Sequence, residues 1–295
     1  DRALLQGIAS CLMKGITRED IENSSQEIAE NWDNAIKSIK LAIDFLKKHC
    51  SVPTSKFIPY NTMIAPLIYF FSKKPTLQLA PELIKRLKRF FWLGVFSDRY
   101  IQSQDTKIAE DIQRMDELLL DNKKDLFKYR VKVNDYDVLL TDANFGSATS
   151  NAFMCFFASR TPLEFKNNEK INLERNFGQE NQKELHHIFP KNFLKTKISE
   201  NKKLKKEIAP YIDSIANISL VSSATNKAVS DRAPNEYFTK FEKDNLNISL
   251  SLNSHFIEDL ESFGIQKNDF QQFLKKRSKK IATEINNFLE ELKKD

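Results

Sequence analysis

Two adjacent histidines, His186 and His187, are the residues of this sequence whose types best suit acid–base or metal chemistry. The chain has four histidines in 295 residues, and these two lie in the stretch 184–191 (ELHHIFPK). Apolar neighbours and Pro190 predict a short strand that ends where the chain turns outward. Because successive residues of a strand point to opposite faces, one imidazole can bind a metal ion while the other takes a proton. A histidine pair at a strand end is also often structural, so the pair alone leaves both readings open.

Two asparagines follow the pair. Residues 215–221 (IANISLV) alternate in polarity and are rich in β-branched side chains, which predicts a second strand with Asn217 near its start. Residues 222–227 are expected to turn into a helix that carries Asn226. Taken one at a time, Asn217 is typical of a turn or a strand ladder, and Asn226 of a helix cap. Their joint spacing with the histidine pair is what makes them candidates for a site.

The elements that must position these residues belong to a chain predicted to be mainly α with a small β component. It contains only 6 glycines and many amphipathic runs, a composition that favours helices. We expect a helical array over residues 1–130 and a second domain over residues 131–295. The strand–loop–strand–helix core of the second domain spans about residues 183–240, and residues 241–295 add C-terminal helices.

Two of the expected helices carry specific signals. Ser147 is expected to cap a helix that runs to about Ser159. In the first domain, apolar residues recur at helical spacing and predict one buried stripe. These residues are Trp32, Ile36, Ile39, Ile43 and Leu46. Such stripes are typical of a hydrophobic core rather than of a cofactor site.

The composition excludes several classes of protein. Hydrophobic residues make up 41% and charged residues 29% of the chain, which fits a globular protein with a sizeable core. No apolar run is long enough to predict a membrane span, and no signal-peptide pattern is present. The three cysteines, Cys11, Cys50 and Cys155, are far apart and form no C-x-x-C pair, which argues against a zinc ribbon or a disulfide framework. We therefore expect a cytoplasmic protein.

Positive charge is concentrated beside the histidine pair. The net charge is +6, and residues 183–240 hold 11 Lys and Arg against 6 Asp and Glu. This distribution suits a polyanionic partner such as nucleic acid. A lysine run is also typical of a solvated helix face, and composition alone does not separate the two readings. The other two histidines, His49 and His255, are assigned no chemical role.

Four segments together match a known pattern. They are residues 186–195 (HHIFPKNFLK), 215–217 (IAN), 224–227 (ATNK) and 230–234 (SDRAP). The first three resemble the HNH family of His-Me finger (ββα-metal) nucleases. With the fourth, the sequence resembles more closely the C-terminal nuclease half of the GmrSD-type, modification-dependent restriction endonucleases. The helical first half also resembles the helical segment of that family. The family's N-terminal nucleotide-binding domain, with its Asp-Gly-Gln-Gln-Arg signature, does not occur in the sequence, so the resemblance covers only part of a family member.

The resemblance implies a metal-dependent endonuclease that hydrolyses DNA, within a bacterial defence system that restricts foreign, modified DNA. By the family's motif, His187 is the general base for water, and His186 and Asn226 bind one divalent metal ion. Asn217 occupies the position that braces the loop after the first strand and helps to orient the base. Many relatives have Asp in place of His186. A neutral nitrogen ligand there weakens the pull on Mg²⁺ and favours Mn²⁺, Ni²⁺ or Zn²⁺.

The same resemblance makes DNA the expected partner. Lys191, Lys195, Lys227 and Arg232 lie near the motif and are candidates for phosphate contacts, although each is also an ordinary surface residue. The family's nucleotide-binding domain is a second expected partner, and no membrane is expected. A single finger cuts one strand, so double-strand cuts would need a homodimer or two successive nicks. Two alternatives stay open: a non-catalytic module that binds DNA or a protein, and a nuclease toxin of the same fold that acts on RNA.

Overall fold

The computed structural model describes residues 2–11, 17–23, 25–97, 99–121, 124–178, 185–199 and 202–294. The chain divides into two compact units. The first unit comprises residues 1–52, 58–131 and 289–295, and the second comprises residues 53–57 and 132–288. Within the described ranges, no helix is long and apolar enough to cross a membrane.

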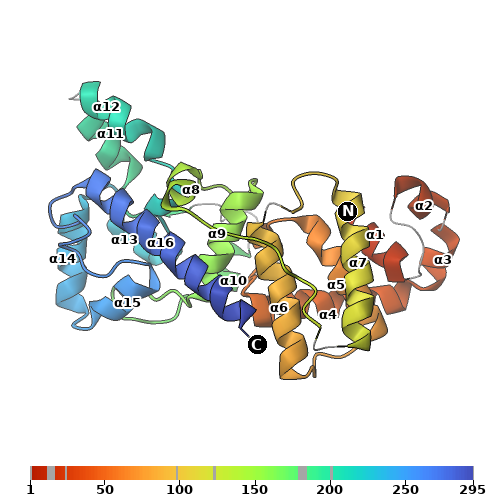
Figure 1. Cartoon of the computed structure of the whole chain (residues 1–295). Coiled ribbons are helices and arrows are strands. Elements are labelled where there is room, and N and C mark those ends of the chain that lie inside the picture. The colour runs from red at the N-terminus through yellow and green to blue at the C-terminus, as the bar shows by residue number, and fades with distance from the viewer. Residues whose placement is uncertain are drawn as a thin grey trace. The chain divides into compact units, whose positions relative to one another are not determined.

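The first unit is built from helices (Figure 1). In chain order they are α1 (Arg2–Cys11), α2 (Arg18–Asn23), α3 (Ser25–Glu30), α4 (Trp32–Cys50), the 3-10 turn η2 (Asn61–Met63), α5 (Ile64–Lys73), α6 (Pro81–Phe96) and α7 (Gln104–Leu120). Every residue of α5 from Ile64 to Phe71 is buried, because a helix that is apolar all round is stable only inside a core. Helices α1, α4 and α7 pack against it. At Gly7, α1 comes so close that a Cβ would lie 2.6 Å from Cδ1 of Ile68.

The stripe predicted for α4 is only partly right. Ile39 and Leu46 are buried, whereas Trp32 is 48% exposed and Ile43 is 37% exposed. The buried residues of this helix are Ala35, Ser38, Ile39, Ala42, Phe45, Leu46 and Cys50. Small side chains let a helix approach its neighbours closely, so the core face of α4 follows its alanines as well as its large apolar residues. A pattern read from large apolar residues alone therefore misplaces that face.

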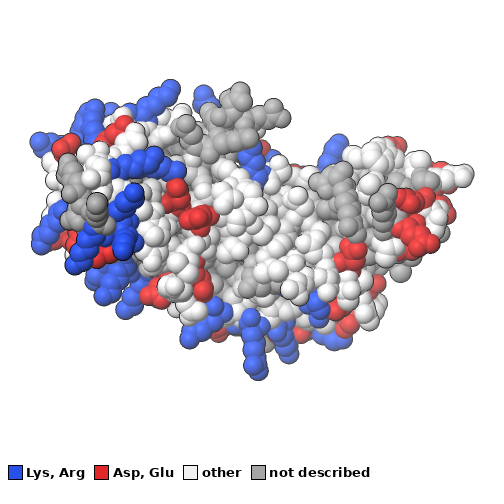
Figure 2. Space-filling model, turned by 90° about the horizontal axis from the view of Figure 1, so that it is seen from above, with Lys and Arg blue, Asp and Glu red and all other residues white. Residues whose placement is uncertain are grey.

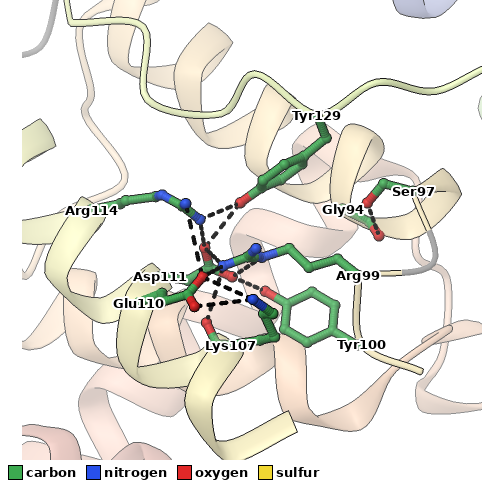
Figure 3. Close-up of polar contacts among 9 residues, drawn as sticks. All are labelled: Gly94, Ser97, Arg99, Tyr100, Lys107, Glu110, Asp111, Arg114 and Tyr129. Atoms are coloured by element: carbon green, nitrogen blue, oxygen red, sulfur yellow. Dashed lines mark hydrogen bonds and ion pairs between the residues drawn. The ribbon is translucent and has the colours of Figure 1, made fainter. Parts of the chain in front are cut away.

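A buried carboxylate on α7, Asp111, is the centre of a polar cluster in the first unit (Figure 3). It accepts hydrogen bonds from Nε and Nη2 of Arg99 (3.0 Å each), Nη1 of Arg114 (2.7 Å), and the hydroxyls of Tyr129 (2.9 Å) and Tyr100. Burial alone would lower the pKa of Arg99, but the hydrogen bonds to its carboxylate partners raise it above its ordinary value. Asp111 thus compensates buried positive charge while its own oxygens are fully hydrogen-bonded.

The second unit holds mostly short helices, one long C-terminal helix and the only β-sheet in the described residues. Its elements are η1 (Ser55–Phe57), α8 (Asp135–Leu140), α9 (Ala148–Ser159), α10 (Leu173–Phe177), β1 (His186–His187), α11 (Lys191–Ser199), α12 (Lys202–Ile208), η3 (Ala209–Tyr211), η4 (Ile215–Asn217), β2 (Ile218–Ser219), α13 (Ser223–Val229), α14 (Pro234–Asp244), α15 (Ile248–Ser254) and α16 (Phe270–Lys293). The last residues of α16 group with the first unit. Ser147 caps α9 through its side chain, and the helix ends at Ser159, as predicted. The prediction of a mainly helical chain with a small β component is confirmed.

Strands β1 and β2 pair in antiparallel fashion, with His186 opposite Ser219 and His187 opposite Ile218. The predicted second strand over residues 215–221 is wrong at its start. Residues 215–217 form η4, in which the Ala216 amide donates to the Ser214 hydroxyl and the Asn217 amide donates to the Ser214 carbonyl (2.8 Å). A local side-chain acceptor therefore stabilises a turn where alternation predicted extended chain.

The Asp111 cluster predicts a large difference between two neighbouring carboxylates. Asp111→Asn should lower the free energy of unfolding by about 3–5 kcal/mol, because it removes the buried carboxylate partner of Arg99 and leaves that guanidinium only the more exposed Glu110. Glu110→Gln is the matched control, since Glu110 is 37% exposed and the loss of an exposed pair costs less than about 1 kcal/mol. Urea denaturation of both variants measures the difference. Equal losses would mean that Asp111 does not compensate the arginines.

Candidate active site

A cavity of about 780 Å³ opens beside the two-stranded sheet. Its lining includes four residues singled out from the sequence, namely His186, His187, Asn226 and Lys191, and one that the sequence did not suggest, Asp213. The expected core begins at residue 183 and the segment 184–191 at residue 184, and both of these residues lie outside the described ranges. The cavity therefore brings the histidine pair together with a carboxylate and an amide.

The end of β1 is held by the side chain of Asn217, which is fully buried. The Asn217 carbonyl accepts a hydrogen bond from the Ile188 amide (2.8 Å), and its side-chain Oδ1 accepts one from the Phe189 amide (2.9 Å). Its Nδ2 donates to the carbonyls of Phe189 (3.1 Å) and Ile212 (3.0 Å). The Asn217 side chain therefore adds two hydrogen bonds, both to the backbone of Phe189, to a sheet whose own strands are two residues long. Pro190 lacks an amide proton, so the ladder stops there.

His186 is 4% exposed and contacts Asn226, with Nδ1 of the ring 2.7 Å from Oδ1 of the amide. Burial lowers the pKa of His186 to about 4, against the opposing effect of the Asn226 hydrogen bond. The imidazole is therefore neutral at pH 7 and keeps a lone pair on one nitrogen. Its Nε2 is buried and has no hydrogen-bond partner among the described residues.

The position of Asn226 follows from the start of α13. Ser222 caps this helix by accepting a hydrogen bond from the Thr225 amide (3.2 Å), and the Ser222 carbonyl accepts the Asn226 amide (3.0 Å). The Thr225 hydroxyl donates to Oε2 of Glu164 (2.5 Å). The cap fixes the first turn and directs Asn226 toward β1. The sequence predicted this helix start correctly.

His187 is held by a carboxylate. Its Nε2 lies 2.9 Å from Oδ1 of Asp213, and the same oxygen forms an ion pair with Nζ of Lys191 at 2.6 Å. Burial would raise the pKa of Asp213, but its bonds to Lys191 and His187 outweigh burial and lower it. Burial lowers the pKa of His187, so the ring is neutral at pH 7. Because an ionised carboxylate only accepts, the proton of the neutral ring is on Nε2 and the lone pair is on Nδ1.

Beneath the sheet, a buried arginine of α16 binds the backbone of β2. Arg277 is fully buried, and its guanidinium donates to the carbonyls of His255 (3.0 Å), Ala216 (2.7 Å) and Ile218 (2.7 Å). Burial lowers its pKa to about 9, which still leaves it charged at pH 7. Ala216 and Ile218 flank Asn217, so this cation holds the segment from which Asn217 reaches β1.

His255, to which no role was assigned, is a second support beneath the sheet. Its Nδ1 accepts from the Ser219 hydroxyl (2.8 Å), and its Nε2 donates to the Leu163 carbonyl (2.9 Å). Burial lowers the pKa of His255 to about 3. Both ring nitrogens are hydrogen-bonded in the neutral form and the side chain is buried, so the residue is part of the core.

The remaining residues suggested for phosphate contacts lie outside the cavity lining. Lys195, Lys227 and Arg232 are all exposed, the first on α11, the second on α13 and the third just after α13. Asp213 and Arg277 were missed because neither belongs to a recognisable spacing. Asp213 does stand four residues before Asn217, and a carboxylate just upstream of the second strand was the one signal available for it.

The residues of the cavity fit a divalent metal ion bound by few protein ligands. Within the described part of the chain, no group of three or more His, Cys, Asp and Glu side chains is arranged to hold a metal. His186 and Asn226 lie at the wall of an open cavity and could supply one nitrogen and one oxygen ligand. Because the Asn226 Oδ1 accepts the proton of His186 Nδ1 in a 2.7 Å hydrogen bond, a bound ion would take the place of that proton. Sites that use two protein ligands complete their coordination with water and substrate oxygens.

The fold and the cavity define a mainly helical protein with a histidine site on a two-stranded antiparallel sheet. The family model "GmrSD restriction endonucleases, C-terminal domain" matches residues 131–284. The match covers more than half of the chain, so the chain belongs to this family, as the sequence motifs indicated.

One similar protein extends the comparison beyond the matched domain. The uncharacterized protein MJ0686 of Methanocaldococcus jannaschii is 25% identical to this chain over 298 residues. The similarity covers 92% of this chain and 47% of the relative. The chain thus spans about half the length of the relative that it matches.

His255 predicts how stability depends on pH. Its folded-state pKa of about 3 lies below the unfolded value of about 6.5, so the unfolded chain binds more protons between these values and stability falls as the pH falls below about 6.5. From pH 7 to pH 5 this single group should cost about 2 kcal/mol. His255→Gln cannot titrate and should show a decline smaller by that amount, measured by urea denaturation at both pH values. Identical declines in the two proteins would exclude His255 as a source.

Proposed function

We propose that this chain is a metal-dependent endonuclease with an HNH, or ββα-metal, active site that hydrolyses phosphodiester bonds of DNA. The observation that supports it most is the pairing of β1 with β2, which sets His186 against Asn226 and His187 against Asp213 on one cavity wall. Membership of a family of restriction endonucleases supports the same reaction class and favours DNA as the substrate.

His187 is the general base in this proposal. Hydrolysis needs a water molecule from which a proton is removed as it attacks phosphorus. The ring of His187 is neutral at pH 7, and its hydrogen bond to Asp213 leaves the lone pair on Nδ1. Asp213 acts as a positioning residue, because it fixes both the orientation and the tautomer of the base. Asn217 holds the backbone that follows the histidine pair and so keeps the base in place.

His186 and Asn226 are the residues that would hold the divalent ion. When bound, such an ion supplies a positive charge beside the scissile phosphate, where negative charge develops on the phosphoryl and leaving oxygens. The neutral nitrogen of His186 makes Mn²⁺, Ni²⁺ or Zn²⁺ as suitable as Mg²⁺. In this reading the biological role is restriction of foreign, modified DNA in antiviral defence.

The primary test is nicking of supercoiled plasmid in Mg²⁺, Mn²⁺ or EDTA. His187→Ala should lower the nicking rate by about 10²–10⁴-fold, the usual contribution of a general base. His49→Gln removes a histidine from the first unit and should nick at the rate of the unaltered protein. Nicking that persists in EDTA would contradict the metal requirement, and equal rates in His187→Ala would contradict the base assignment.

Asp213→Asn tests the positioning of the base. The amide removes the negative charge and weakens the preference for one tautomer of His187, so kcat should fall by about 10-fold to 10²-fold with little change in KM. Asp142→Asn makes the same change at an exposed residue outside the cavity lining and should leave kcat unaltered. Both are measured with a fluorescent oligonucleotide duplex over a range of concentrations that extends to saturation. A rise in KM with unchanged kcat would place Asp213 in substrate binding instead.

A further inference from the structure

Two consecutive helices beside the cavity carry an unusual density of lysine. We call α11 and α12 together the lysine arm. In sequence, α11 is KNFLKTKIS and α12 is KKLKKEI, so the two helices hold seven lysines and a single acidic residue, Glu207. Lys and Arg side chains gather at the left-hand end of the view in Figure 2, over the part of the second unit that carries α11 and α12.

The apolar side of the lysine arm is anchored to the second unit. Leu194 and Ile208 are buried. Nζ of Lys197 donates to the Asn268 carbonyl (3.2 Å), and Glu207 accepts a hydrogen bond from Gln271 of α16 (3.0 Å). These contacts hold both helices against the second unit, and the one acidic residue of the two helices is hydrogen-bonded.

The outward side of the arm has lysines with no acidic partner. Lys195, Lys205 and Lys206 are exposed, and no described carboxylate forms an ion pair with any of them. The charges of these three lysines therefore lie on the surface, where an anionic partner can contact them.

The arm is continuous with the cavity. Lys191 is the first residue of α11 and also lines the cavity, where it pairs with Asp213. A polyanion that lies along the arm would therefore pass the residue that borders the proposed base. This continuity distinguishes the arm from lysines scattered elsewhere on the surface.

We propose that the lysine arm binds the phosphate backbone of duplex DNA next to the cavity, an inference that rests on the proposed nuclease function. Lysine ammonium groups contact phosphates as point charges and read no sequence. The arm offers no free aromatic surface for unstacked bases, because its one aromatic residue, Phe193, packs with Phe189 (6.4 Å between ring centroids) and lies under Nζ of Lys197 (5.0 Å). Single-strand binding depends on such stacking, so a duplex is the better fit.

The test measures binding without cleavage. The protein is His187→Ala in EDTA, and the probe is a fluorescent DNA duplex whose Kd is measured by anisotropy over a range of NaCl concentrations. In that background, Lys195→Gln/Lys205→Gln/Lys206→Gln should reduce the slope of log Kd against log salt by about 2.7, or roughly 0.9 for each lost phosphate contact. At 0.1 M salt the loss of affinity should be on the order of 10²-fold.

The matched control removes three exposed lysines from another part of the second unit, Lys166→Gln/Lys240→Gln/Lys243→Gln. Both variants lose three positive charges, so a general electrostatic effect would weaken the DNA binding of both to the same extent. A slope reduction confined to the arm variant supports the proposal. Equal slopes in the two variants, no duplex binding by the parent protein, or tighter binding of single-stranded DNA or duplex RNA would each overturn it. Because no cleavage is measured, these results are independent of whether plasmid nicking depends on His187.

Discussion

The site depends on an antiparallel pairing that is too short to hold itself together. Strands of two residues form few backbone hydrogen bonds with each other. Even an isolated two-stranded hairpin is at best marginally stable in water. The missing stability comes from Asn217, whose side chain forms a reciprocal pair of hydrogen bonds with the backbone of Phe189. The hydroxyl of Tyr237 adds a further bond, to the Ile188 carbonyl (2.6 Å). Side chains thus replace the strand residues that this sheet lacks.

Burial sets the charge state of the histidines around this pairing. Desolvation lowers the pKa values of His186, His187 and His255 alike, so all three are neutral at pH 7. The nearby Arg277 guanidinium donates hydrogen bonds to three backbone carbonyls, and its pKa of about 9 keeps it charged at pH 7. Its charge also opposes protonation of His186 and His255. One buried cation therefore braces the strand and helps to keep the neighbouring imidazoles neutral.

The sequence was most informative where local chemistry decides the structure. The cap at Ser147, the helix start at residues 222–227, the strand at the histidine pair and the helical class all follow from short-range patterns. The predictions from the sequence were wrong where residues far apart in the chain determine the local structure. The turn at 215–217 has a local acceptor in Ser214, but its Ala216 carbonyl is bound by Arg277, 61 residues away in the chain. The core face of α4 depends on which neighbours its small residues can approach.

The residues of the candidate site also fall into those that the sequence suggested and those that it did not. Motif spacing suggested His186, His187, Asn217 and Asn226, and the structure brings all four together around the sheet. Asp213 and Arg277 have no such spacing, because their contacts are made through the fold. A carboxylate and an arginine are common in any sequence, and only three-dimensional proximity distinguishes these two.

The position of Arg277 in the chain has a consequence for biosynthesis. Arg277 lies 61 residues after Ala216, whose carbonyl it binds. The segment that contains β1, Asn217 and β2 therefore emerges from the ribosome well before Arg277. Until α16 has been translated, the carbonyls of Ala216 and Ile218 lack their guanidinium donor, and the short sheet has only its local contacts. The nascent chain therefore carries the histidine pair before the backbone support from Arg277 has been made.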